Sequence, residues 1–275
     1  MPAANDSPQR DVKVGEVVFL GTGTSVGVPA LGCNCDVCLS DDPRDNRTRC
    51  AIVIGLPSGN LLIDTPPDLR SQLLRERIGV IHAVAFTHSH ADHLFGLDDL
   101  RLFPFQLGHP VPLYCEWFVE RRIRHSYDYC FLTTPMTHSG ARPQLEPRRI
   151  APNQRCQVLG TQLLPIRLFH GTAKVLGFRF GDFAYCTDTN HLPDTAFRQL
   201  QGVKTLVLDA LRYRPHPTHF HLDAALQVAA KVKAESTYLT HISHDFSFRQ
   251  LQPQLPDGVR LAYDGLRVTC DLTAR

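Results

Sequence analysis

Short, largely apolar runs recur along the chain, and their length is typical of buried strands rather than of helices. They predict strands at residues 16–20, 51–54, 61–64, 83–86, 111–115, 163–169, 175–180, 183–187, 205–209, 236–240, 260–263 and 266–270. Three neighbouring pairs predict hairpins, whose turns fall at residues 57–60, at 181–182 and at Asp264-Gly265. The chain is therefore expected to be rich in β-sheet.

A helical pattern is carried by three segments, at residues 68–77, 116–129 and 222–232. In the last of them, apolar residues at positions 222, 225, 226 and 229 form one stripe. Residues 133–160 are rich in proline, arginine and polar residues, and predict an irregular connection. Residues 1–12 are polar and predict a flexible tail without the apolar core of a signal peptide. Because no change in composition marks a boundary, we expect a single domain over residues 1–275.

Composition and charge narrow the class of protein. The chain is 43% hydrophobic and 20% charged, as ordinary globular proteins are. Its net charge of +2 does not favour nucleic-acid binding, although it does not exclude it. No apolar run approaches the roughly 20 residues that a membrane span needs. Nine cysteines, three of them crowded into residues 33–38, suit a reducing compartment better than a disulfide framework. We therefore expect a cytoplasmic protein without a membrane segment.

The densest chemistry follows the predicted strand at residues 83–86. There, Thr87-His88-Ser89-His90-Ala91-Asp92-His93 has the pattern H-x-H-x-D-H. Imidazole and carboxylate together suit zinc, manganese or iron, and ligands this close can serve two ions at once. The alternative is a histidine-rich surface turn. The metal interpretation is favoured because further ligand types follow later strands.

Those further ligand types stand at the ends of four other predicted strands. They are Asp64, His170, Asp188 and His241. A carboxylate can bridge two ions whereas a neutral imidazole nitrogen binds one, so Asp188 is the bridging candidate. Asp64 suits either a helix cap or a buried residue that orients a ligand histidine. Three more histidines, His216, His219 and His221, precede the helix predicted at residues 222–232.

A second metal motif is the trio Cys33, Cys35 and Cys38, which has the spacing C-x-C-x-x-C. Three thiolates can wrap one tetrahedral zinc ion, but the fourth ligand must come from elsewhere in the chain. A histidine there would close the site and make it structural. The alternatives are three free thiols in a loop or redox use of Cys35 and Cys38.

The alternation of strand and ligand along the whole chain resembles the metallo-β-lactamase superfamily. Asp64, the H-x-H-x-D-H segment, His170, Asp188 and His241 match the order of that superfamily's motifs. The resemblance implies an α+β fold, an αββα sandwich of two mixed β-sheets flanked by helices. It also implies a metal site at one edge of the sandwich.

Within the superfamily, the chain resembles the PhnP-like cyclic-phosphate phosphodiesterases, which are related to tRNase Z. The segment Gly21-Thr22-Gly23-Thr24-Ser25-Val26-Gly27-Val28-Pro29, the cysteine trio and Leu239-Thr240-His241-Ile242-Ser243-His244 carry this resemblance. It implies that His244 joins Cys33, Cys35 and Cys38 around a structural zinc, with residues 32–50 as an inserted zinc clip. It also implies a catalytic histidine 22 residues before the last metal ligand, which is His219. His221 lies close to it, and the sequence leaves both open.

The same resemblance implies a dinuclear site of two divalent ions, zinc or manganese. One ion is assigned to His88, His90 and His170, the other to Asp92, His93 and His241, with Asp188 and a hydroxide bridging them. We group Asp92 and Asp64 with His219 as candidate catalytic residues, Asp64 by fixing a ligand histidine. The expected function is hydrolysis of small, linear or cyclic, phosphodiesters by a homodimer.

Other functions stay open. A tRNA 3′-processing endoribonuclease shares the core motifs, but its long arm for gripping tRNA has no recognisable counterpart here. The same hydroxide could attack a carbonyl carbon, which would make the chain a thioester or lactone hydrolase. A resemblance to the cofactor-biosynthesis proteins of the PqqB type and a non-catalytic metal-binding protein on the same fold are the remaining alternatives. Fold alone does not fix the substrate.

Overall fold

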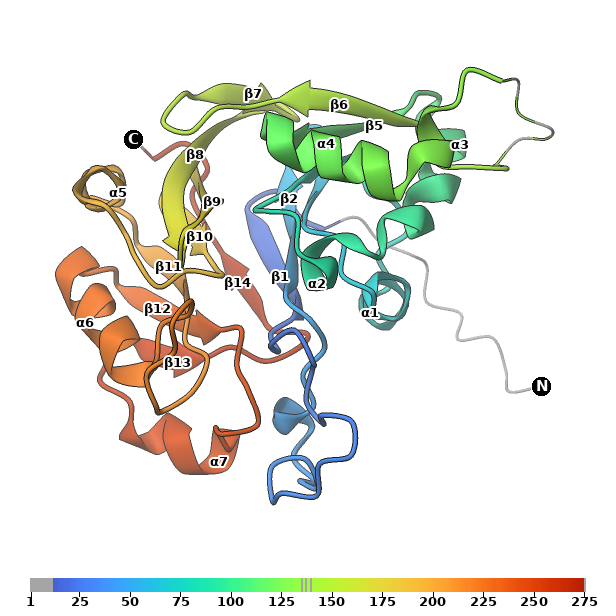
Figure 1. Ribbon diagram of the computed structural model, residues 1–275. Helices are drawn as coiled ribbons and strands as arrows, with labels where there is room; N and C mark the ends of the chain where they lie inside the picture. Colours follow the sequence, from blue (N-terminus) through green and yellow to red (C-terminus); the bar gives the residue numbers. More distant parts are fainter. Residues whose placement is uncertain (1–11, 135, 137, 139, 275) are drawn as a thin grey trace.

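Two β-sheets packed face to face form the centre of the computed structural model, and helices cover both outer faces (Figure 1). The structure describes residues 12–134, 136, 138 and 140–274. The predicted tail at residues 1–12 lies outside this range except for Val12, which is buried and donates its backbone N–H to Asn60 Oδ1.

The first sheet has the strand order β14-β1-β2-β3-β4-β5-β6. Its strands are β1 (Glu16–Gly21), β2 (Ala51–Leu56), β3 (Gly59–Ile63), β4 (Ala83–Ala85), β5 (Val111–Cys115), β6 (Leu145–Arg149) and β14 (Arg267–Thr269). Pairing is antiparallel from β14 to β3 and parallel from β3 to β6.

The second sheet has the order β13-β12-β11-β10-β9-β8-β7 and the same mixture of pairings. Its strands are β7 (Cys156–Val158), β8 (Thr161–His170), β9 (Ala173–Phe180), β10 (Phe183–Cys186), β11 (Thr205–Asp209), β12 (Ser236–Thr240) and β13 (Val259–Leu261). Two mixed sheets flanked by helices confirm the predicted α+β sandwich.

Helices cover the outer face of each sheet. Those on the side of the first sheet are α1 (Leu69–Glu76), α2 (Ala91–Leu94), α3 (Phe103–Leu107) and α4 (Trp117–Ser126), with the 3-10 turns η2 (Leu97–Leu102) and η3 (Asp128–Phe131). Those on the side of the second are α5 (Asp194–Gln199), α6 (Leu222–Val232) and α7 (Phe248–Leu251), with η4 (Gln252–Gln254). A further turn, η1 (Pro43–Asp45), lies in the loop between β1 and β2. None of the described helices has the length and apolarity to cross a membrane.

Alternation along the strands divides the apolar side chains among three buried layers. In β1, Val17 and Phe19 face the other sheet, whereas Val18 and Leu20 face the helices of the first sheet. This period of two is the normal consequence of the β-pleat. Each fully buried side chain of this size contributes roughly 1.5–3 kcal/mol to folding. The sandwich is thereby rigid enough to hold residues at its strand ends in fixed positions.

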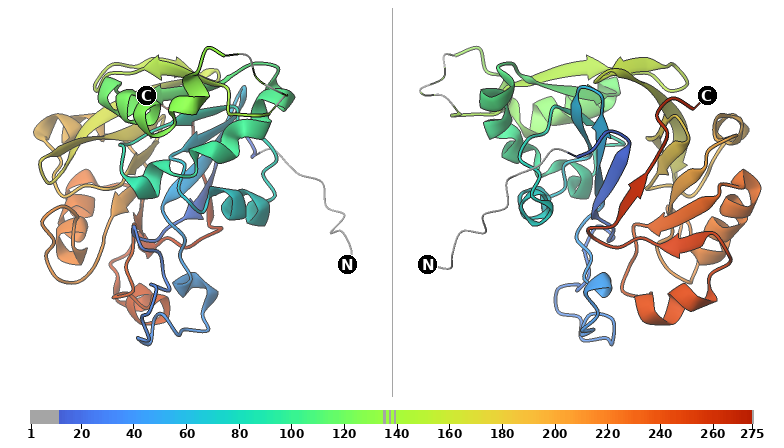
Figure 2. Two further views of the ribbon diagram at one scale, coloured as in Figure 1. Left: turned by 45° about the vertical axis from the view of Figure 1, so that its right-hand side comes forward. Right: turned by 180° about the vertical axis from the view of Figure 1, so that it is seen from behind.

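The predicted C-terminal hairpin is wrong. β13 pairs with β12 in the second sheet, whereas β14 pairs with β1 in the first, so the chain changes sheets at Asp264 (Figure 2). The Asp264 carboxylate accepts hydrogen bonds from the backbone N–H and hydroxyl groups of Thr22 and Thr48, at 2.6–3.0 Å. These four bonds hold the crossing point and replace a hairpin turn.

The irregular connection predicted at residues 133–160 is also wrong in part, because it contains β6 and β7. Both are strands at the outer edge of their sheets. β6 includes Pro147, which lacks a backbone N–H, and an edge strand tolerates this because one of its sides has no neighbouring strand to bond. The content of proline, arginine and polar residues is that of a loop, so composition predicted a loop where the structure has a strand.

Candidate metal centre

Strand ends bring the predicted ligands together at one place. His88 and His90 follow β4, Asp92 and His93 lie on α2, and His170 is the last residue of β8. Asp188 follows β10 and His241 follows β12. Asp64, Asp188 and His241 have left-handed backbone conformations, with φ of 65°, 53° and 58°. Non-glycine residues in this region are uncommon and gather at functional sites.

One group of candidate ligand atoms comes from Asp92, His93, Asp188 and His241, all within 4.8 Å of one another. His93 Nε2 lies 3.3 Å from Asp92 Oδ2 and 3.2 Å from Asp188 Oδ1. His241 Nε2 lies 3.4 Å from the same Asp188 oxygen. Two imidazoles and two carboxylates thus converge on one point.

A second group of candidate ligand atoms comes from His88, His90 and Asp188, and a third from His170, Asp188 and His219. His88 Nε2 lies 3.7 Å from Asp188 Oδ2, the oxygen that His93 and His241 do not face. The His90 ring stands 4.5 Å from the His88 ring and 5.1 Å from the His170 ring, between centroids. Asp188 therefore offers one oxygen to His93 and His241 and the other to His88, which is one way for a carboxylate to bridge two ions.

The donor set fits divalent metal ions. His88 Nε2, His93 Nε2 and both ring nitrogens of His241 are buried without a hydrogen-bond partner in the described structure. An unsatisfied buried polar atom costs roughly 1–3 kcal/mol, so four in one place point to missing partners. Burial lowers the pKa of His88 well below its ordinary value, which keeps that ring neutral as a ligand must be. Burial opposes ionisation of Asp188, but His241 and His93 outweigh it and hold its pKa well below the usual range.

Asp64 contacts His93 and stands outside the candidate ligand groups of the described residues. Its fully buried carboxylate lies 2.8 Å from His93 Nδ1 and accepts hydrogen bonds from the Thr87 N–H and hydroxyl, at 2.9 and 2.7 Å. With Nδ1 engaged, His93 Nε2 is the nitrogen that faces the ligand group. Such a partner fixes both the tautomer and the orientation of a ligand histidine. The orienting role that the sequence suggested for Asp64 stays a prediction.

His219 occupies the edge of the centre. Its ring is 4.4 Å from the His170 ring and stacks 4.6 Å from the His241 ring, between centroids. Its Nδ1 lies 2.7 Å from Oδ2 of Asp209, a completely buried carboxylate at the end of β11. His221 instead stands at the N-cap of α6. Of the two histidines left open by the sequence, only His219 joins the candidate ligand groups of the described residues.

Two supporting residues were missed by the sequence reasoning. Asp209 holds His219, and the carbonyl oxygen of Thr218 lies 2.7 Å from His170 Nδ1. Asp209 could have been found, because it ends the run TLVLD just as Asp64 ends LLID. Thr218 acts through its backbone, so its residue type carried no signal.

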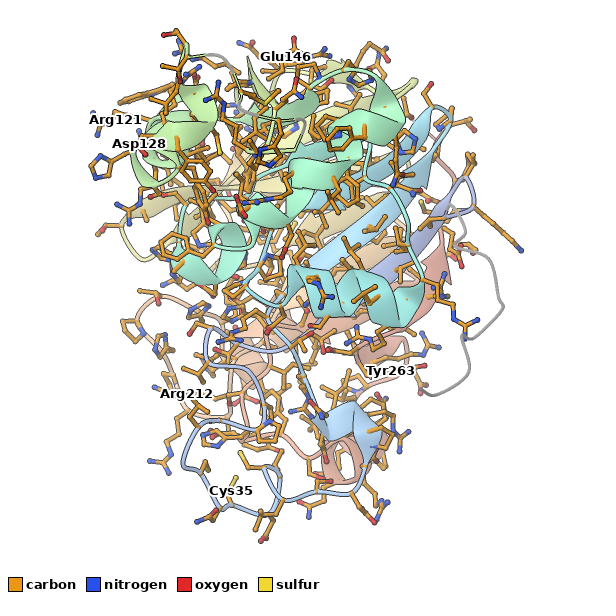
Figure 3. The ribbon with its side chains drawn as sticks, turned by 90° about the vertical axis from the view of Figure 1, so that its right-hand side faces the viewer. Cys35, Arg121, Asp128, Glu146, Arg212 and Tyr263 are labelled. Atoms are coloured by element: carbon orange, nitrogen blue, oxygen red, sulfur yellow. The ribbon has the colours of Figure 1, made fainter. Side chains whose placement is uncertain are left out.

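The cysteine trio and His244 form another candidate ligand group. Cys35 lies at the lower end of the molecule in Figure 3. His244 Nδ1 lies 3.1, 3.5 and 3.4 Å from the sulfur atoms of Cys33, Cys35 and Cys38. Tetrahedral zinc with ordinary bond lengths would separate sulfur from nitrogen by about 3.6 Å. The Cys38 backbone N–H lowers the pKa of Cys35 to about 7, which favours the thiolate that binds metal, whereas burial raises the pKa of Cys38 to about 11 in the absence of an ion. The four residues therefore fit a closed zinc site.

Arg47 links the clip to the segment that follows His241. Its guanidinium is completely buried and donates to Asp45 Oδ1, the Phe246 carbonyl and the Ser243 carbonyl, at 2.6, 2.8 and 3.1 Å. Ile242 pairs with Gly23 by a β-bridge on the other side. The segment after His241 is thus held both by the clip and by the loop after β1.

Replacing Cys35 by serine is expected to remove the clip's zinc and to lower the melting temperature. A closed zinc site contributes directly to folding, and the clip anchors the segment that follows His241. Elemental analysis and thermal unfolding would measure both effects. Cys156→Ser, outside the clip, is the matched control. Unchanged zinc content and melting temperature in Cys35→Ser would contradict a zinc clip.

Comparison with known proteins agrees with this geometry. A family model for the β-lactamase superfamily domain matches residues 59–242. The crystal structure of a new diphosphatase from the PhnP family is 42% identical, covers 94% of this chain and 97% of that one, and has a TM-score of 0.87. Human tRNase Z, short form, is 20% identical over 92% of this chain and 98% of that one, with a TM-score of 0.62, a likeness of fold alone.

The chain is also similar to a longer curated relative. An octanoyltransferase of Porphyromonas gingivalis is 34% identical over 257 residues, which is 92% of this chain. That match spans 51% of the relative, so this chain corresponds to about half of its length.

Proposed function

Because the chain belongs to the metallo-β-lactamase superfamily and is a metal-dependent hydrolase, we propose that it hydrolyses small disubstituted phosphates. This class comprises linear and cyclic phosphodiesters and diphosphate diesters, in which the reacting phosphorus carries two bridging oxygens. The observation that carries the proposal is the sharing of Asp188 among three candidate ligand groups beside the His219–Asp209 pair. The 42% identity to a diphosphatase of the PhnP family supports it.

We assign two divalent ions, zinc or manganese, to the centre. His88, His90 and His170 would hold one and Asp92, His93 and His241 the other, with Asp188 shared. When bound, such ions polarise phosphoryl oxygens and lower the pKa of water, as hydrolysis of a phosphate ester requires. The chain's own part is to fix these ligands, through Asp64 at His93 and Thr218 at His170.

His219 is the candidate proton donor. Asp209 engages its Nδ1 and leaves Nε2 as the free ring nitrogen. From the edge of the centre, Nε2 would protonate the oxygen that leaves phosphorus. Proton donation by a positioned side chain contributes roughly 10²–10⁴-fold to the rate. The buried carboxylate of Asp209, which also accepts the Thr189 N–H at 2.8 Å, favours this orientation of the ring, since rotation would break the 2.7 Å contact with Nδ1.

The remaining predictions form part of the same proposal. We propose one domain over residues 1–275, with residues 32–50 as an inserted clip that holds a third, structural zinc. We also keep the cytoplasmic location, the homodimer and the small-molecule substrate as predictions.

The test pairs metal content with turnover in one sample. We expect about three ions per chain, because two ions are assigned to the centre and one to the clip. We also expect hydrolysis of bis-p-nitrophenyl phosphate that a chelator abolishes. Metal-loaded protein that turns over neither this diester nor a diphosphate diester would contradict the proposal.

A second candidate is hydrolysis of an acyl thioester, which the likeness to an octanoyltransferase favours. The same residues could act at a carbonyl carbon, because polarised oxygen and activated water serve both reactions. Octanoyl thioester should be assayed beside the phosphodiester. A kcat/KM for the thioester well above that for both phosphate substrates would move the assignment to this candidate.

A further inference from the structure

The histidines assigned to the metal centre differ in what contacts their Nδ1 atoms. His93 Nδ1 lies 2.8 Å from the Asp64 carboxylate, and His170 Nδ1 lies 2.7 Å from the Thr218 carbonyl oxygen. His241 Nδ1, by contrast, is buried and has no hydrogen-bond partner among the described residues. One assigned ligand therefore lacks the support that the other two have.

The ion assigned to His241 does not supply the missing partner. His241 Nε2 is the nitrogen that faces the ligand group, at 3.4 Å from Asp188 Oδ1 and 3.7 Å from Asp92 Oδ2. The two nitrogens of an imidazole point to different sides of the ring, so Nδ1 cannot bind the same ion. A neutral histidine that binds metal through Nε2 carries its proton on Nδ1, and this buried N–H needs an acceptor.

Four buried side-chain oxygens of the described residues also lack a hydrogen-bond partner. They are Gln72 Oε1, Tyr185 Oη, Gln199 Oε1 and Asp209 Oδ1. Of these four residues, only Asp209 shares a candidate ligand group with His241, and the ligand atoms of that group lie within 4.8 Å of one another. Asp209 is completely buried, so bulk solvent does not reach its free oxygen. An unpaired acceptor thus lies close to an unpaired donor.

The other oxygen of Asp209 is already occupied. Oδ2 lies 2.7 Å from His219 Nδ1 and accepts the Thr189 N–H at 2.8 Å. The His219 ring stacks on the His241 ring, with 4.6 Å between centroids and 14° between planes. One water with hydrogen bonds of about 2.8 Å on either side joins atoms about 4.6 Å apart, which suits this spacing. Ordered waters inside proteins occupy such places, between buried polar atoms that have no other partner.

We propose that Asp209 is a positioning residue for two rings at once. Its Oδ2 holds His219, and its Oδ1 accepts the Nδ1–H of His241 through one bridging water. This inference rests on the metal assignment within the proposed function, and not on the identity of the substrate. A partner at Nδ1 fixes the tautomer and orientation of a ligand histidine and makes its Nε2 a stronger ligand. One buried carboxylate would thereby set the candidate proton donor and a metal ligand in a common geometry.

The test measures metal affinity rather than turnover, in the variant Asp209→Asn. Its amide oxygen should stay at the Oδ2 position, where the Thr189 N–H and His219 need an acceptor. The amide nitrogen then takes the Oδ1 position, and the charge that supports His241 is lost. We expect the dissociation constant of zinc at the centre, measured by competition with a chelator, to rise roughly 10- to 100-fold, as for other partners of ligand histidines.

His219→Ala is the matched control, because it removes only the other partner of Asp209 and should leave that dissociation constant nearly unchanged. Equal losses of affinity in both variants, or no loss in Asp209→Asn, would overturn the inference and leave the proposed function in place.

A crystal structure of the zinc-loaded parent protein decides the same question without a variant. It should show an ordered water about 2.7–3.2 Å from both Asp209 Oδ1 and His241 Nδ1. A structure in which His241 Nδ1 bonds to any other group would overturn the inference alone. A parent protein that binds no metal at the centre would overturn the proposed function and the inference with it.

Discussion

Replacing Asp188 by asparagine is expected to reduce metal binding at the centre and to lower turnover by roughly 10³-fold or more, about 4 kcal/mol of transition-state stabilisation. The change removes the charge that two ligand groups share while keeping the shape of the side chain. Asparagine tolerates the left-handed backbone that Asp188 adopts at φ 53°, so the fold should survive.

Elemental analysis, turnover of bis-p-nitrophenyl phosphate and thermal unfolding would be measured on the same sample. Asp128→Asn, on an exposed turn, is the matched control and should behave as the parent protein does. The zinc of the cysteine clip should remain in both variants. If Asp188→Asn keeps every ion and most of its turnover, the shared-ligand assignment is wrong.

Replacing His219 by alanine should leave the metal content unchanged and lower turnover by roughly 10²–10⁴-fold. The reason is that Asp209, and not an assigned metal ligand, holds the ring. The loss should be larger for a diester with an alkoxide leaving group than for bis-p-nitrophenyl phosphate, because p-nitrophenolate departs without a proton.

His221→Ala is the matched control for this prediction. His221 stands at the start of α6, and its removal should change turnover little. Near-full activity in His219→Ala, together with a large loss in His221→Ala, would transfer the role to His221. A loss of metal in His219→Ala would instead make His219 a ligand.

The pattern of apolar residues along the chain predicted most of the strands and helices. It failed where contacts between distant residues determine how the strands pair. The runs at residues 205–209 and 222–232 became β11 and α6 with unchanged bounds, because β11 is buried along its whole length and α6 buries one apolar stripe. The hairpin at Asp264 failed because four hydrogen bonds from Thr22 and Thr48, far away in the sequence, hold that carboxylate. β6 was missed because an edge strand tolerates proline and charge.

Residue type and place along the chain likewise predicted most of the candidate centre. His88, His170 and His241 each follow or end a strand, and the structure brings them together as the spacing suggested. The sequence did not show which residues contact and support these histidines. Asp209 is recognised as a partner of His219 from the 2.7 Å contact between them, and Thr218 as a partner of His170 from the contact of its backbone carbonyl.

The left-handed backbone at Asp64, Asp188 and His241 lowers the free energy of unfolding, so the candidate centre costs the protein thermal stability. Each such residue costs of order 1–3 kcal/mol relative to one that adopts the conformation freely. Glycine at position 241 would relieve that cost and would also remove a buried ring whose nitrogens have no partner without metal. A library selected for heat resistance alone would therefore accumulate changes at these three positions and lose hydrolysis. Substitutions meant to raise the melting temperature should leave these three residues unchanged and be placed in surface loops away from the centre.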